Sequence, residues 1–237
     1  MDRRTLAIEM LVKGCPGAYI DFFFLTHKDL IESERPSDAE LIARGIDPER
    51  HEVHNNMSPE AMRLLREHLV QAEACQRAGD VEGVYAAWEK AAQYFVGTHE
   101  YKTGAYFYSK CLHVAASTGW VHGEMDANLN LGLVSEQLGR MEDAVSYHER
   151  HLQLARQHGT PGDREQAERN LLDLYARQAD AAHARGDFAA EEHSLRQMAL
   201  AATLAGNRSA EGDAALRMGQ SLIRSGQLIE ALEVRKG

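Results

Sequence analysis

A short glycine turn recurs along the chain and sets the unit from which it folds. Its copies lie 60, 47 and 40 residues apart, at Gly79-Asp80-Val81, Gly139-Arg140-Met141, Gly186-Asp187-Phe188 and Gly226-Gln227-Leu228. Apolar residues on both sides of these turns recur about every 3.6 positions, which indicates amphipathic helices. Because one such helix pair cannot bury its apolar face alone, the recurrence predicts pairs that stack on their neighbours.

The clearest pair lies in residues 125–158. Gly139 separates two apolar patterns of helical period: Leu129, Leu131, Leu133, Val134 and Leu138 before it, and Met141, Ala144, Val145, Tyr147, Leu152, Leu154 and Ala155 after it. Gly132 and Ala144 are small, so we expect them where the two helices cross and their backbones approach closely.

This pair resembles the tetratricopeptide repeat, whose pattern runs Leu-Gly-x2-Tyr, then Gly, then Ala-x3-Phe. Four of its places are filled by Leu131, Gly132, Gly139 and Ala144, whereas Ser135 and His148 stand where the family has aromatic residues. The resemblance implies an all-α, right-handed helical solenoid. It gives as repeat-packing positions Gly132, Gly139, Ala144, Gly186, Phe188, Gly219 and Gly226.

The pattern divides the chain into an N-terminal helical segment (1–36), a linker (37–57) and the repeats (58–237). We expect helices at 3–13, 17–33, 58–78, 81–96, 101–118, 164–185 and 187–205, and a last pair from 208. The 101–118 helix has no mate in the repeat pattern, and Asp163 is placed to cap the helix at 164. The array is expected to be incomplete at its C-terminus, which would leave three residues partly exposed: Leu216, Leu222 and Ile223.

Composition narrows the classes of function. The net charge of −10 over 237 residues argues against binding nucleic acid or anionic lipid. No apolar run is as long as a membrane span, and Glu9 interrupts any signal-like region. The cysteines are Cys15, Cys75 and Cys111, which are widely spaced and odd in number, so we expect reduced, inert thiols in a cytoplasmic protein.

No catalytic motif stands out. The chain has no GxSxG, P-loop or GxGxxG pattern, so we expect no enzyme and no cofactor. His148 and His151 have a spacing that suits a metal, as do His51 and His54, but zinc needs further ligands and no Cys pair or HExxH motif supplies them. We therefore expect no metal, and a function based on protein–protein binding.

Nearly the whole chain resembles the tetratricopeptide repeat protein 29 family. The residues that carry this resemblance are Glu9-Met10-Leu11, Ala72-Glu73-Ala74, Asp80, Val84, Tyr94-Phe95, Phe107-Tyr108, Cys111, Leu131-Gly132-Leu133, Gly139-Arg140 and Tyr147-His148-Glu149. The resemblance implies a scaffold of the cilium or flagellum that is associated with the axoneme and needed for flagellar assembly and sperm motility. Its partners would be axonemal or flagellar assembly components, including dynein-related ones.

A second resemblance stays open. The stretch from Tyr147 to Gly159 is similar to the forty-residue repeats of the Pins-type cortical adaptors. That likeness implies an adaptor that binds peptide segments of polarity or spindle-orientation partners. The two readings predict different locations for the protein, the flagellum and the cell cortex.

The repeat register also predicts a binding strip, since the first helix of each pair lines the concave surface of such a solenoid. With Met125 as position one, the strip comprises Asn130, Arg169, Asn170, Arg177, Arg217 and Arg224. Arginine matches carboxylates and asparagine binds peptide backbone, so the strip predicts an acidic or amide-rich segment as ligand. The alternative is that the arginines pair with nearby acids such as Asp173 and Asp213.

Overall fold

The computed structural model describes residues 3–26 and 57–226. This part of the chain is all-helical, with ten helices and no strand, and each helix packs on its neighbour in sequence within two compact units. The prediction of an all-α helical-repeat arrangement is confirmed at this level. The boundary between the units falls between Trp120 and Val121, a division that the sequence did not predict.

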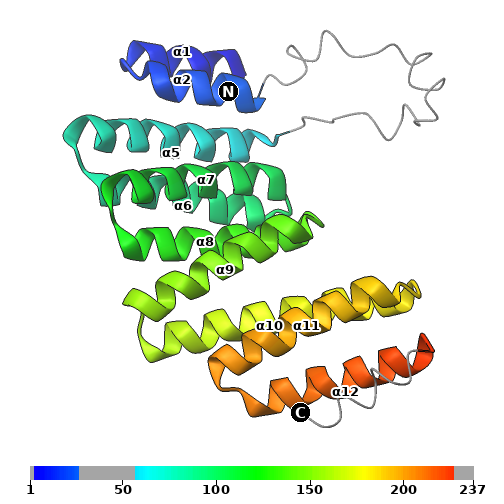
Figure 1. The fold of residues 1–237 in the computed structure, drawn as a ribbon. Coiled ribbons are helices and arrows are strands. Elements are labelled where there is room, and N and C mark those ends of the chain that lie inside the picture. Colours follow the sequence, from blue (N-terminus) through cyan, green and yellow to red (C-terminus); the bar gives the residue numbers. More distant parts are fainter. Residues whose placement is uncertain (1–2, 27–56, 227–237) are drawn as a thin grey trace, which may run out of the picture. The chain divides into compact units, whose positions relative to one another are not determined.

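The first unit contains five described helices (Figure 1): α1 (Arg3–Val12), α2 (Pro16–Thr26), α5 (Pro59–Ala78), α6 (Val81–Gly97) and α7 (Tyr101–Thr118). The predicted helix at 101–118 is confirmed to the residue. It has a mate after all, because α7 packs along α6. The second half of the predicted helix 17–33, and all but the last residue of the predicted linker 37–57, lie outside the described residues.

The phenylalanine-rich helix α2 is only partly buried. Phe22 is fully buried, and α2 packs on α5, as expected for a helix with so many large apolar groups. Ile20 and Phe24 are nevertheless 63% and 49% exposed. Deeper in the unit, the rings of Phe95 and Phe107 stack with their centroids 6.0 Å apart and join α6 to α7.

One ion pair on α5 holds the turn between α1 and α2. The Ala18 backbone N–H, in the first turn of α2, donates to Glu73 Oε2 at 2.7 Å. Arg77 donates to the Gly14 carbonyl oxygen just beyond α1 and pairs with Glu73 at 2.5 Å. Negative charge favours a helix N-terminus and positive charge favours a C-terminus, so the pair satisfies both helix ends at once.

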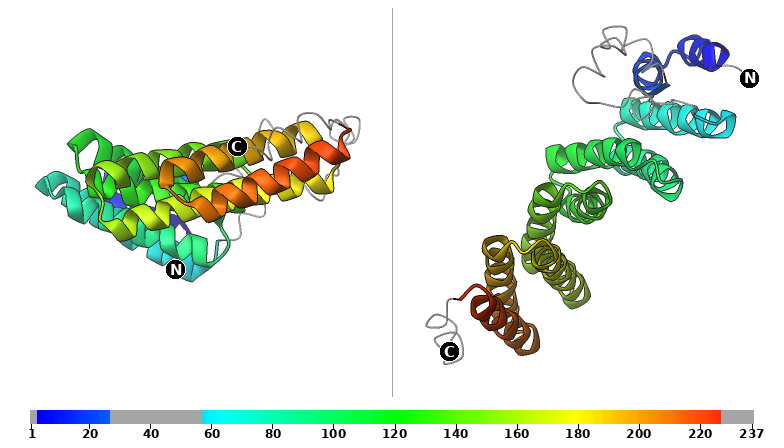
Figure 2. Two further views of the ribbon diagram at one scale, coloured as in Figure 1. Left: turned by 60° about the horizontal axis from the view of Figure 1, so that its bottom comes forward. Right: turned by 90° about the vertical axis from the view of Figure 1, so that its right-hand side faces the viewer.

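The second unit contains α8 (Val121–Gln137), α9 (Met141–His158), α10 (Pro161–Ala184), α11 (Phe188–Ala205) and α12 (Arg208–Arg224). Each helix contacts the next one in the chain, and Figure 2 shows this order from two further sides. The predicted helix pairs at 125–158 and 164–205 are confirmed, whereas the second helix of the last predicted pair lies outside the described residues. Helix α8 begins at Val121, about one turn before Met125.

Most of the hairpins end their first helix in the same way. After α8, the Gly139 N–H donates to the Glu136 carbonyl and the Arg140 N–H to the Ser135 carbonyl, with Gly139 at φ 70°. This left-handed C-terminal cap strongly favours glycine. The same cap follows α7 at Gly119-Trp120, a copy of the turn that the sequence analysis missed. The 60-residue interval from Gly79 to Gly139 therefore contains another turn of the same kind.

The start of α10 corrects one prediction. The N-cap is Thr160, not Asp163, and the helix begins at Pro161. Thr160 Oγ1 accepts from the Asp163 N–H at 3.3 Å, and Asp163 Oδ2 accepts from the Thr160 N–H at 2.8 Å. Asp163 thus completes a reciprocal capping box from inside the helix.

The last described helix exposes part of its apolar surface. Leu216 and Ile223 on α12 are 62% and 58% exposed, as predicted. Leu222, which was expected to share this exposure, is buried instead because it packs into the core of the unit. Residues 227–237 lie outside the described part, including the Leu228 end of the predicted turn at Gly226.

Candidate protein-binding groove

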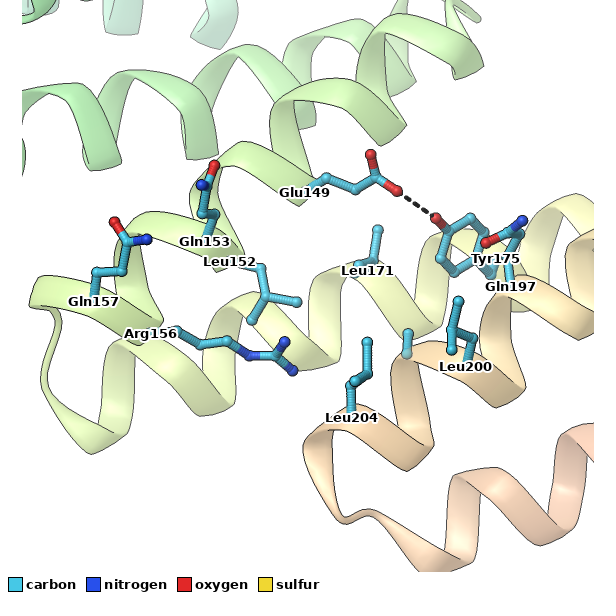
Figure 3. Close-up of a pocket in the computed structure, with 11 residues that line it drawn as sticks. Glu149, Leu152, Gln153, Arg156, Gln157, Leu171, Tyr175, Gln197, Leu200 and Leu204 are labelled. Atoms are coloured by element: carbon cyan, nitrogen blue, oxygen red, sulfur yellow. Dashed lines mark hydrogen bonds between the residues drawn. The ribbon is translucent and has the colours of Figure 1, made fainter.

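An apolar groove crosses the second unit between α9 and α11, with α10 as its floor (Figure 3). Its volume is about 300 Å³. It is lined by Glu149, Leu152, Gln153, Arg156 and Gln157 of α9, Leu171 and Tyr175 of α10, and Gln197, Leu200, Ala201 and Leu204 of α11. We call it the α9–α11 groove.

Helical spacing produces its two unlike walls. Glu149, Gln153 and Gln157 follow one another every four residues on α9 and form a polar edge. On α11, Leu200 and Leu204 form an apolar edge and are 56% and 64% exposed. The buried face of α11 is a different stripe, which includes Leu195, Met198 and Ala202. The helix therefore carries more apolar residues than the core requires.

The groove continues as a second hollow of about 420 Å³ toward the N-terminal ends of α9 and α11. The two hollows share Glu149, Tyr175 and Gln197. The second one adds Glu142 and Val145 of α9, Gln178 of α10 and His193 of α11. The N-terminal parts of α9 and α11 thus border one hollow and their C-terminal parts the other, so these two helices run in the same direction.

Hydrogen bonds fix the polar groups at the centre of the groove. The Tyr175 hydroxyl donates to Glu149 Oε1 at 3.0 Å, and Figure 3 shows this bond across the floor. Burial, and then the charge and hydrogen bond of Glu149, raise the pKa of Tyr175, so the phenol stays neutral. At the other end, Arg156 makes a long contact of 3.5 Å with Glu168.

This arrangement suits the binding of another protein. An apolar centre with a polar rim is the composition of a protein interface. The groove contains no cysteine or serine that a base could activate. Across residues 3–26 and 57–226, no group of three or more His, Cys, Asp or Glu side chains is arranged to hold a metal ion.

The residues of the predicted arginine strip lie elsewhere in the second unit, and three of its arginines already have acidic partners. Arg177 pairs with Glu136 of α8. Arg217 pairs with Asp180 of α10 at 2.5 Å. These partners are neither of the acids considered from the sequence; Arg177 reaches only the backbone carbonyl of Asp173, at 3.3 Å.

The third paired arginine and the two asparagines also belong to the strip. Arg224 donates to Glu191 of α11 at 2.7 Å. The Asn130 side chain bonds within its own helix, to the Asp126 carbonyl at 2.9 Å. Asn170 is half-buried on α10 and lines neither the α9–α11 groove nor the hollow that contains Arg169.

Arg169 lines a separate hollow of about 650 Å³ between α10 and α12. Four carboxylates share this hollow: Glu165, Glu168, Asp173 and Asp213. One guanidinium among four acids gives a negative surface, which repels an acidic ligand. The surroundings of Arg169 therefore do not favour the acidic ligand that the sequence predicted for the strip.

Of the predicted packing residues, Gly132 lies in the closest contact. A Cβ atom on Gly132 would lie 2.6 Å from His148 Cε1, so the histidine ring covers this glycine directly. Ala144 is fully buried on the same helix as His148. The imidazole is fully buried too, and its Nε2 lies 2.7 Å from Glu136 Oε1.

The other predicted packing residues are not in close helix–helix contacts. Gly139, Gly186 and Gly226 are turn residues with φ between 69° and 83°. Gly219 lies within α12, and an added Cβ there would meet no atom within 4 Å. Phe188, the first residue of α11, is 38% exposed.

Sequence reasoning missed two further close contacts in the first unit. A Cβ on Gly104 would lie 2.5 Å from Val96 Cγ2, where α6 and α7 cross. A Cβ on Gly83 would lie 2.7 Å from Cys75 Sγ, where α5 meets α6. The three cysteines are free thiols, and burial raises the pKa of Cys111.

Sequence reasoning also missed the leucine edge of the α9–α11 groove. One signal was available, because the predicted helix 187–205 carries Leu200 and Leu204 in addition to a complete buried stripe. An excess of apolar residues on the outside of a helix indicates a binding surface.

Comparison with family models and with curated proteins gives no match for this chain. None of the helices in the described residues is both long and apolar enough to span a membrane.

Proposed function

We propose that this chain is a non-enzymatic scaffold of the tetratricopeptide type that binds another protein through the α9–α11 groove. The observation that carries the proposal is the leucine edge of α11, where Leu200 and Leu204 stand exposed beside an open groove. Large exposed leucines next to a hollow with a polar rim are typical of protein interaction sites.

Three features support the tetratricopeptide assignment. The helices of the second unit are 17 to 24 residues long and are joined by short turns. Gly132 occupies the close contact between α8 and α9 that the repeat pattern gives to a glycine. Ala144, the small residue of the second helix, is fully buried.

We further propose that the scaffold belongs to the cytoplasm and axoneme of a cilium or flagellum. There it would serve flagellar assembly and motility by holding axonemal or assembly components, including dynein-related ones. Support for this location comes from the resemblance of scattered residues along the chain, from Glu9-Met10-Leu11 to Tyr147-His148-Glu149. The Pins-type alternative draws its support from Tyr147 to Gly159 and places the protein at the cell cortex.

Localisation of the tagged full chain in dividing, ciliated cells separates the two locations. We expect axonemal signal that survives detergent extraction, and that is lost when Leu200 and Leu204 are both changed to Asp. The matched control is Leu216→Asp, an exposed leucine of α12 outside the groove, which should keep the signal. Cortical signal would favour the Pins-type reading, and diffuse signal would contradict both.

A further inference from the structure

We infer that the α9–α11 groove binds a single amphipathic helix that runs antiparallel to α9 and α11, with a carboxylate in its first turn and a cation in its last. This inference rests on the proposed function, since it names the ligand of the proposed groove. Three features of the groove indicate this ligand: the length of the groove, the leucine edge of α11 and the unequal charge of the two ends of the groove.

The length of the groove matches a short helix. The α11 wall extends from His193 to Leu204 across both hollows. At 1.5 Å per residue this wall is about 16 Å long, which corresponds to about three helical turns. Such a helix presents apolar side chains at positions i, i+3, i+4 and i+7.

The walls favour a helix over an extended strand. α9 and α11 run in the same direction, and α10 closes the floor with Leu171 and Tyr175. A channel between two parallel helices is the space into which the side-chain ridges of a third helix pack. Leu152 and Leu171 at the bottom, with Leu200 and Leu204 at the edge, offer apolar contacts to those ridges.

Charge gives the helix its direction. Glu142 borders the end of the groove near the N-termini of α9 and α11, and Glu149 lies at its centre. Arg156, which makes a long contact with Glu168, borders the other end. A cation of the ligand fits beside the two glutamates and a carboxylate fits beside Arg156. A helix favours acids in its first turn and bases in its last, so the complementary ligand places its N-terminus at Arg156. That direction also sets its macrodipole against those of α9 and α11.

The probe is a fluorescein-labelled peptide of about 14 residues with leucines at helical spacing, a glutamate pair in the first turn and a lysine pair in the last. A second peptide exchanges the glutamates and lysines, and a third scrambles the leucines. Fluorescence anisotropy against the full chain should show the first peptide bound about tenfold more tightly than the exchanged one. Glu149→Lys combined with Arg156→Glu should invert this preference, which separates groove charge from the helicity of the peptides.

Matched leucine variants locate the binding site. Leu204→Asp should weaken binding of the first peptide by at least about tenfold, whereas Leu216→Asp on α12 should leave it unchanged. Both leucines are largely exposed, at 64% and 62%, so neither change should disturb the fold, which circular dichroism checks.

Equal binding of the three peptides, absence of binding, or equal effects of the two leucine variants would each overturn the inference. A dimer that Leu204→Asp dissociates in sedimentation would also overturn it, by making a second copy of the chain the occupant. Because localisation does not depend on the probe, axonemal signal that is lost in the Leu200→Asp, Leu204→Asp variant would leave the scaffold function standing after any of the peptide failures.

Discussion

Two surfaces of the second unit use their side chains in opposite ways. Along α10 and α12, Arg177, Arg217 and Arg224 find carboxylates on neighbouring helices, so their charges are matched within the chain. Along α9 and α11, Leu200 and Leu204 lie exposed over an open groove. A row of arginines on a helix face is therefore no evidence of a ligand until the acids of the adjacent helices have been located.

The two surfaces differ from the joint between α8 and α9, where polar groups are buried. His148 and Glu136 meet there, with the imidazole fully buried and the carboxylate 6% exposed. Arg177 reaches the same carboxylate from α10, so a residue predicted to bind a ligand instead helps to hold three helices together. Variants that perturb this joint should affect both surfaces, whereas variants of either surface should affect only that one.

Gly132→Leu should have the largest effect, because it removes the joint on which both surfaces depend. The new side chain would overlap the ring of His148, which is fully buried. We expect a loss of about 3 kcal/mol or more in the free energy of unfolding, measured by urea denaturation. Gly219→Leu is the control, since its Cβ meets open space, and equal losses in the two variants would contradict the packing of α8 on α9.

His151 should make the unit lose stability as the solution becomes acidic. Burial, and then the charge of the neighbouring His148, lower the pKa of His151 to about 4 against the opposing charge of Asp163. The unfolded chain binds this proton with the ordinary pKa near 6.5, so stability falls as the pH drops from about 6.5 to 4. The loss should be on the order of 2–3 kcal/mol. His151→Phe should remove it, and the same pH slope in both proteins would contradict the assignment.

Glu191→Ala should destabilise the surface of paired arginines along α10 and α12 and leave the α9–α11 groove unchanged. Its carboxylate is 4% exposed and accepts from Ser221 Oγ at 2.8 Å and from Arg224 at 2.7 Å. Removal of this acceptor should cost about 1–3 kcal/mol. Probe binding in the α9–α11 groove should persist in this variant, and its loss would show that the two surfaces are coupled.

The Glu191 carboxylate should also make the stability of the unit depend on pH in the acidic range. Burial raises the pKa of Glu191, but the hydrogen bond from Ser221 and the charges of Arg224 and His183 outweigh burial, so the net pKa lies below its ordinary value of 4.5. The stabilisation is therefore present above about pH 4.5 and is lost at lower pH, as the folded carboxylate takes up its proton. Glu191→Gln should flatten the unfolding curve in this acidic range, whereas an unchanged curve would contradict the assignment.

Arg217→Ala should have the smallest effect. Its partner Asp180 is 69% exposed, and a solvent-exposed ion pair contributes less than about 1 kcal/mol. A thermal melt should therefore change little, and probe binding not at all. Strong loss of binding in Arg217→Ala would instead support the arginine strip and its acidic ligand.

The sequence was sufficient for the helices but not for the groove. Helix 101–118 could be predicted because its ends follow from local turn chemistry, at Gly97-Thr98 and Gly119. Gly119-Trp120 was not recognised as another copy of the turn, and the packing of α7 along α6 was missed as well. The α9–α11 groove depends on the distance between two helices that are separated in sequence by all of α10, a distance that helical periodicity does not encode.

The ion pairs of the arginine strip could not be predicted from the sequence either. Helical register placed the arginines, but their partners come from 41, 37 and 33 residues away. No local pattern links Arg177 to Glu136 across that separation, because the pairing follows from how α8 and α10 pack. Charge matching between repeats is therefore a property of the packed structure that has to be established before a surface is assigned to a ligand.

Photocrosslinking of the full chain in ciliated cells tests most directly which surface meets a partner. Benzoylphenylalanine would replace either Leu204 in the α9–α11 groove or Arg169 in the hollow between α10 and α12. We expect a protein adduct from position 204 and none from position 169. Adducts from position 169 alone, or from neither position, would contradict this expectation.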